Sequence, residues 1–264
     1  MGQGTGTGGR RLRLAVATAG LVAVVVVAAL DVVGPAPGEE AAGVVTADAL
    51  LFLRIPTVSM ALDLVAAARG DAPALDRGLR AARDATGYDL LDPDTWRGLA
   101  VDLDAPLAVS LHPAPPLAGV LVVTIPIREG TPALDGAGLL FSRVPMASRP
   151  RLDRDASLGS VPGYFRVGGR PRAAVVEWED DLLVALPLGA GDVEAGLDGW
   201  IRRTLDDDGE RLVSEAGVRD GLRTHRDAPL VILCRDGDGA RACAQAPEAP
   251  APVIAALFEK LLGR

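Results

Sequence analysis

The chain has 264 residues, of which 49% are hydrophobic and 3% aromatic, and its formal net charge is -8. This length allows a sizeable core, and the apolar content excludes wholesale disorder. Binding to nucleic acid needs clustered positive charge, and stacking on bases needs aromatic side chains. The acidic, aromatic-poor composition therefore argues against a nucleic-acid partner.

The N-terminal region has the pattern of an export signal or a membrane anchor. Residues 1–13 are glycine-rich and basic and predict a flexible N-terminus, and residues 14–33 open with seventeen residues that carry no charge. A helix over this segment would span roughly 25–30 Å, the lower limit for crossing a bilayer. The arginines are expected to stay inside, which places everything after Gly34 outside the cytoplasm. Two interpretations stay open: a single-pass inner-membrane anchor, or a signal peptide that is cleaved on secretion.

Residues 34–47 are rich in Pro, Gly, Glu and Ala and predict a linker. An extracytoplasmic domain is expected to follow over residues 48–264, with possible halves at 48–127 and 160–264. For the first half, the patterns predict a strand, two helices, a short helix and two strands, over residues 49–55, 57–69, 73–86, 92–96, 106–112 and 119–125. Asp92 and Pro93 mark the start of the short helix, because Asp is a good N-cap and Pro suits the first helical position.

The pattern weakens between residues 128 and 159, where Gly, Pro and Arg interrupt every apolar run. Beyond it, strands are predicted over residues 163–167, 173–178 and 182–186, helices over 192–205 and 212–224, then a hairpin containing both cysteines and a final amphipathic helix over 252–262. Locally paired strands with clustered helices predict an α+β fold, with helices packed on a mostly antiparallel sheet.

A short sequence motif that occurs twice suggests an internal duplication. The sequence Asp-Ala-Pro-Leu begins at Asp104 and again at Asp227, and each copy precedes a predicted strand. We therefore expect two diverged strand-helix-helix-strand-strand repeats, preceded by one N-terminal hydrophobic helix. The segments TADALLFLRIP and GYDLLDP, together with these DAPL strands, resemble uncharacterised bacterial envelope proteins that carry domain-of-unknown-function labels. The resemblance covers most of residues 45–235 and implies a location and a fold, but no catalytic residues.

The only two cysteines, Cys234 and Cys243, flank Asp238-Gly239, a dipeptide suited to a two-residue hairpin turn. In that register the cysteines lie directly opposite each other at a non-hydrogen-bonded pair, about 4.5 Å apart at Cα. We therefore expect a cross-strand disulfide, as is typical of exported domains. A metal site would need more ligands than two thiols, and the spacing differs from the CxxC of redox enzymes.

Neither histidine gives a catalytic signature. Ser110 and His112 share a strand face, but the strand rise separates them by roughly 6.6 Å, beyond the reach of a nucleophile–base hydrogen bond. We expect His112 to be a solvated strand-end residue, and His225 to sit at a helix C-terminus, where partial positive charge is favourable. Four other groups predict no site: the acidic run 206–210, the pairs Asp102/Asp104 and Glu177/Glu179, and the scattered tryptophans Trp96, Trp178 and Trp200.

The sequence thus predicts no catalytic, cofactor-binding or metal-binding residue. We expect a non-enzymatic binding or interaction domain, held at the membrane through its N-terminal segment or secreted, whose partner is an envelope protein or an apolar ligand. The alternative is an envelope hydrolase whose site assembles near His112 from distant residues. A nucleophile within hydrogen-bond reach of a histidine inside a cleft would distinguish the two.

Overall fold

The computed structural model describes residues 45–69, 73–128, 151–154, 163–167, 170–178, 180–189, 191–205, 211–225, 228, 231–236 and 239–244. The predicted N-terminal helix within residues 14–33 and the predicted C-terminal helix over 252–262 lie outside these ranges. Within them, no helix is long and apolar enough to cross a membrane.

The elements follow the predicted order closely. The first half contains β1 (Leu51–Ile55), α3 (Val58–Ala68), α4 (Pro73–Thr86), α5 (Pro93–Gly98), β2 (Leu107–Ala114) and β3 (Leu117–Pro126). The remainder contains β4 (Arg151–Arg154), β5 (Gly163–Val167), β6 (Arg170–Trp178), β7 (Asp181–Leu188), α7 (Val193–Leu205), the 3-10 turn η2 (Leu212–Ser214), α8 (Ala216–Thr224), β8 (Val231–Asp236) and β9 (Gly239–Ala244). Of these, β4 was not predicted.

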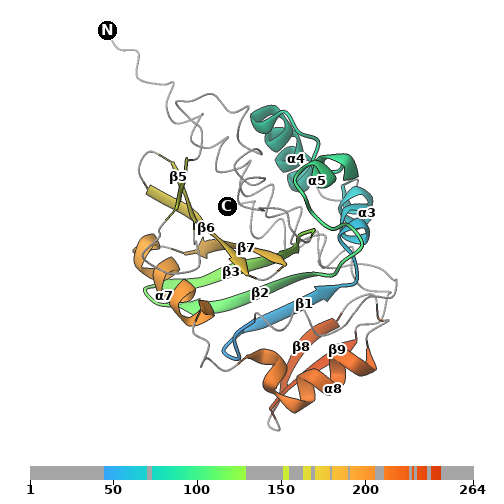
Figure 1. Ribbon diagram of the computed structural model, residues 1–264, viewed down its shortest axis with the longest axis vertical. Coiled ribbons are helices and arrows are strands. Elements are labelled where there is room, and N and C mark those ends of the chain that lie inside the picture. The colour runs from blue at the N-terminus through green and yellow to red at the C-terminus, as the bar shows by residue number, and fades with distance from the viewer. Residues whose placement is uncertain are drawn as a thin grey trace.

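The nine strands in the described residues form one sheet, in the order β4-β5-β6-β7-β3-β2-β1-β8-β9 (Figure 1). Each pair of neighbours is antiparallel. The predicted α+β class with an antiparallel sheet is therefore confirmed.

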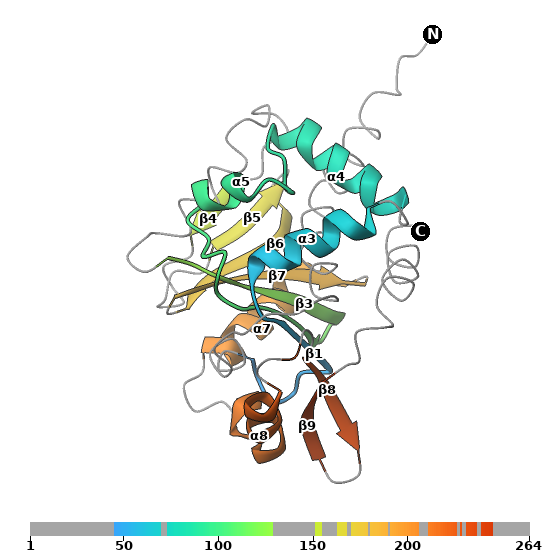
Figure 2. The same ribbon diagram turned by 90° about the vertical axis from the view of Figure 1, so that its right-hand side faces the viewer.

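Helices cover both faces of this sheet (Figure 2). The face under α3, α4 and α5, here called the α3–α5 face, packs one apolar cluster; the face under α7, η2 and α8, here called the α7–α8 face, packs a second. Strand alternation distributes the side chains. Along β2, Leu107 and Val109 belong to the first cluster, whereas Ala108 and Ala114 belong to the second.

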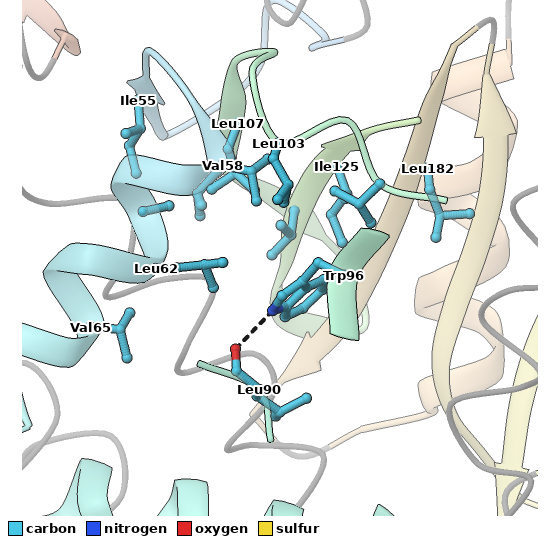
Figure 3. Packing of buried hydrophobic residues seen from close by; sticks show 14 of the residues in the cluster. Ile55, Val58, Leu62, Val65, Leu90, Trp96, Leu103, Leu107, Ile125 and Leu182 are labelled. Carbon is cyan, nitrogen blue, oxygen red and sulfur yellow. Dashed lines mark hydrogen bonds between the residues drawn. The ribbon is translucent and has the colours of Figure 1, made fainter. Parts of the chain in front are cut away.

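Trp96 is the largest anchor of the α3–α5 face (Figure 3). Its indole is buried and Nε1 donates a hydrogen bond to the carbonyl oxygen of Leu90 over 2.7 Å. The local signals predicted this segment correctly: the Asp92 side chain caps α5, with Pro93 in the first turn. Gly87 ends α4 at a φ of 76°, as expected of a glycine cap.

The proline-rich segment after His112 differs from the prediction, in which residues 113–118 separate the strands 106–112 and 119–125. Strand β2 continues through Pro113 to Ala114, which pairs with Leu117, so that only Pro115 and Pro116 connect the two strands. The peptide between these two prolines is cis. Pro113 is tolerated inside the strand because the register shifts between His112 and Ala114, and a bulge removes the need for its missing N–H.

The two-repeat interpretation is not confirmed. In the first proposed repeat, the opening strand β1 pairs directly with β2. In the second, β7 and β8 are separated by β3, β2 and β1. The segments 48–127 and 160–264 also share one sheet, since β7 pairs with β3 and β8 pairs with β1.

Helix α8 lies against the backbone of β9. A Cβ added at Gly217 would stand 2.6 Å from the carbonyl oxygen of Ala240, and one at Gly221 would be closer still to that of Ala242. The N–H of Ala240 donates to Glu215 Oε2 over 3.3 Å. These backbone groups of β9 therefore point toward α8, away from β8, and only glycine allows so close an approach.

Candidate functional site

The polar residues of interest meet on the α7–α8 face. Ser110 and His112 lie on β2, on the same side of the strand as Ala108 and Ala114. Helix α7 covers them, and the ring of Trp200 lies 6.5 Å from the His112 ring, centroid to centroid. The third contributor is the short segment before β1, which the sheet register brings alongside, since the N–H of Leu50 donates to the carbonyl of Leu111.

Ser110 and His112 are hydrogen-bonded, with Ser110 Oγ 2.8 Å from His112 Nε2. The prediction that they are too far apart is wrong. The strand rise of about 6.6 Å separates their backbones, but an imidazole that leans along the strand spans most of that gap. The prediction that His112 is solvated is also wrong, because the side chain is only 2% exposed.

The other ring nitrogen of His112 faces Thr46 and Asp48. Nδ1 lies 3.0 Å from Thr46 Oγ1 and 3.4 Å from Asp48 Oδ1, and the Thr46 hydroxyl donates to Asp48 Oδ1 over 2.5 Å. An ionised carboxylate can only accept hydrogen bonds, so the Thr46 hydroxyl donates its single proton to Asp48. Its oxygen must therefore accept the hydrogen bond from Nδ1–H of His112. In the neutral imidazole, Nε2 is then the acceptor for the Ser110 hydroxyl.

Asp48 is the charged residue of this hydrogen-bond network. The hydrogen bond from His112 lowers the pKa of its carboxyl below the ordinary value, burial opposes the shift, and the Thr46 hydroxyl and the charge of Arg203 reinforce it. Arg203 Nε lies 3.7 Å from Asp48 Oδ2, and Arg203 Nη2 donates to the carbonyl of Pro113 over 2.7 Å. Arg203 on α7 therefore links the Asp48 segment to the end of β2.

The arrangement has the connectivity of a nucleophile, a base and an orienting carboxylate. Ser110 could pass its proton to Nε2 while Asp48 stabilises the imidazolium that results. However, Ser110 is only 1% exposed, whereas the Asp48 side chain, at the opposite end of this hydrogen-bond network, is 39% exposed. The hydroxyl that would attack a substrate thus lies at the sealed end.

The other residues singled out in the sequence have structural roles or lie apart. His225 caps the C-terminus of α8, as expected, and donates its N–H to the Gly221 carbonyl. Asp102 accepts the N–H of Asp104 in a local turn. The tryptophans form no cage, because Trp96 packs on one face of the sheet and Trp200 on the other.

Residues 206–210 and Glu179 lie outside the described residues. In the ranges that the structure does describe, no group of three or more His, Cys, Asp or Glu side chains could hold a metal ion.

The predicted cysteine register is wrong. Cys243 pairs with Ile232, and Cys234 pairs with Arg241, so the two cysteines are diagonal neighbours and not directly opposite. Strand β8 ends at Asp236 and β9 begins at Gly239, so the two connecting positions are 237 and 238, one residue earlier than expected. Cys243 is half-buried and its thiol is free.

Sequence reasoning missed Thr46, Asp48 and Arg203. One signal was available: Thr46 and Asp48 have the same i, i+2 spacing as Ser110 and His112, and they precede a strand that pairs antiparallel with β2. A comparison of β1 and β2 for compatible polar ends would have brought the two pairs together.

Comparison with known protein families, with curated proteins and with solved structures gave no match. Fold and site therefore define the class: an α+β domain with an antiparallel sheet and a Ser–His–Asp hydrogen-bond network whose serine and histidine are buried.

Proposed function

We propose that the chain is a non-enzymatic extracytoplasmic domain, held at the membrane or secreted, that binds an envelope protein or an apolar ligand. The observation that supports it best is the burial of Ser110, because a nucleophile at 1% exposure cannot touch a substrate. In this proposal the Ser110–His112–Asp48 chain fastens the segment that follows the linker to the folded sheet.

Several backbone contacts support this fastening role. Val45 accepts the N–H of Leu212, Thr46 forms a bridge with Arg211, and Leu50 donates to Leu111. Together with the side-chain bonds of His112, these contacts hold the segment to two separate parts of the domain, residues 211–212 and strand β2. A rigid attachment would fix the orientation of the domain relative to its expected anchor.

Location can be tested with spheroplasts that express the full chain. We expect added protease to degrade the domain while a cytoplasmic control protein survives, and mass spectrometry of the mature N-terminus to distinguish the anchor from a cleaved signal. A domain that is protected until the membrane is lysed would refute the proposal.

A second candidate is an envelope hydrolase, favoured by the 2.8 Å contact between Ser110 Oγ and His112 Nε2. A fluorophosphonate probe, which labels activated serines, distinguishes the two functions. The non-enzymatic proposal expects no labelling of the full chain. Labelling that is lost in Ser110→Ala and retained in Ser214→Ala, a change at an exposed serine of η2, would instead establish the hydrolase.

A further inference from the structure

The β8–β9 hairpin holds its cysteines in positions that a disulfide cannot join directly. Cys243 lies opposite Ile232, and Cys234 is two residues further along β8. Diagonal neighbours of this kind are about 7–8 Å apart, whereas a disulfide needs Cα atoms within about 6.8 Å. Bridging the pair therefore requires the backbone to move.

A slide of β9 by two residues along β8 supplies that movement. It would carry Cys243 from its position opposite Ile232 to the position opposite Cys234. An even shift keeps every residue on its original face of the sheet, whereas a shift of one residue would reverse them. The connection would lengthen from two residues to the four at 237–240, which is also a common hairpin length.

The sequence of β9 makes the two registers nearly equivalent against α8. Gly217 and Gly221 lie against the carbonyls of Ala240 and Ala242. After the slide, Ala242 and Ala244 would take those places. Because alanine repeats at every second position of this strand, the contact with α8 does not specify one register over the other.

The remainder of the sheet need not follow. Strand β8 is held by β1 through the pairs Leu53–Ile232 and Arg54–Val231. Strand β9 is last in the sheet order and pairs with β8 alone. Its displacement therefore leaves the pairing of the other eight strands intact.

We propose that Cys234 and Cys243 are a redox-controlled register switch, with the described register in the thiol form and β9 displaced by two residues in the disulfide form. The oxidant is an external disulfide, either oxidised glutathione or a disulfide oxidoreductase. One cysteine thiolate attacks it and releases one thiol; the second cysteine thiolate attacks the mixed disulfide and releases the other. The chain loses two protons and two electrons, and the external disulfide becomes two thiols. This inference does not depend on what the domain binds.

The experiment compares the full chain in detergent, reduced with dithiothreitol or oxidised with oxidised glutathione. Intact-mass spectrometry should show a loss of about 2 Da on oxidation, which is two hydrogens. Register is measured by nuclear Overhauser contacts between Hα atoms of non-hydrogen-bonded pairs, which approach closely across antiparallel strands. We expect the Leu233–Ala242 contact of the reduced form to be replaced by an Arg235–Ala242 contact.

A matched control combines Ile232→Cys with Cys234→Ser, which puts a thiol directly opposite Cys243 in the described register. Its disulfide should form without a slide and keep the Leu233–Ala242 contact. Two outcomes would overturn the proposal. One is a native disulfide that leaves the Leu233–Ala242 contact in place; the other is a native chain that forms no internal disulfide under conditions that oxidise the control.

Discussion

The two faces of the sheet are built differently. On the α3–α5 face, the sheet contributes apolar side chains to a cluster anchored by Trp96. On the α7–α8 face, the buried side chains of the sheet include polar groups. The register places Arg54 and Thr124 on either side of Ala108, a member of the α7–α8 cluster, and Ser110 and His112 follow on the same side of β2.

This difference separates two tasks. Apolar burial stabilises a fold without specifying direction, whereas a buried polar group is costly unless it finds a partner at the correct distance and angle. The α3–α5 face therefore supplies stability that many similar side chains could supply. The α7–α8 face fixes where the Thr46–Asp48 segment sits, because His112 accepts few alternative partners.

The largest expected effect on stability lies on the α3–α5 face. Trp96→Ala removes a buried indole and should lower the free energy of unfolding by about 3–5 kcal/mol. Chemical denaturation with urea measures this loss. Leu50→Ala serves as the control, because Leu50 is 59% exposed and its truncation should change stability by less than about 0.5 kcal/mol. Equal effects of the two variants would mean that Trp96 is not the anchor of this face.

On the α7–α8 face, His112→Ala should destabilise the domain by about 2–3 kcal/mol. The change leaves a cavity and removes the hydrogen-bond partner that Ser110 and Thr46 share. His225→Ala is the matched control. His225 caps α8 with its backbone N–H, which alanine retains, so loss of the imidazole should cost less than about 0.5 kcal/mol. Thermal unfolding of both variants tests the contrast. A similar loss of stability in the two variants would show that the hydrogen bonds around His112 add nothing to stability.

A smaller effect distinguishes the two buried indoles. Trp96 Nε1 donates to Leu90, whereas Trp200 Nε1 has no hydrogen-bond partner among the described residues. Trp96→Phe should therefore cost about 1 kcal/mol more than Trp200→Phe, the value of one buried hydrogen bond. Urea denaturation of the pair checks the difference, and the opposite ranking would contradict it.

The smallest expected effect is a pH dependence. The pKa of Asp48 is lowered in the folded domain, so its stabilising contribution is complete above the pKa of the unfolded chain, near 4, and is lost as the pH falls through the folded value. Asp48→Asn should therefore be less stable than the native chain at pH 7, and the two should converge toward pH 2. Denaturation midpoints across this range measure the effect. A difference that does not change with pH would exclude the proposed ionisation.

Local signals in the sequence predicted the helices well. The Asp92 cap and the Gly87 terminus act within one turn of their helix, so their consequences are visible in neighbouring residues. Strand β4 was missed because its four residues, including two arginines, form no apolar run and are defined only by pairing with β5.

Long-range features were beyond such signals. The Ser110–His112 bond was excluded because backbone spacing was taken for side-chain distance. Asp48 was placed at a linker boundary, and only the pairing of β1 with β2 shows that it approaches His112. The cysteine register was misplaced because the turn has two equally short solutions, one residue apart along the chain.

The close approach of α8 to β9 has a consequence for behaviour at high concentration. Strands with open backbone groups act as templates for other chains and are common origins of fibrils. Here Gly217 and Gly221 let a helix occupy the positions where an incoming strand would hydrogen-bond. This margin of the sheet therefore cannot recruit a neighbouring molecule while α8 remains docked.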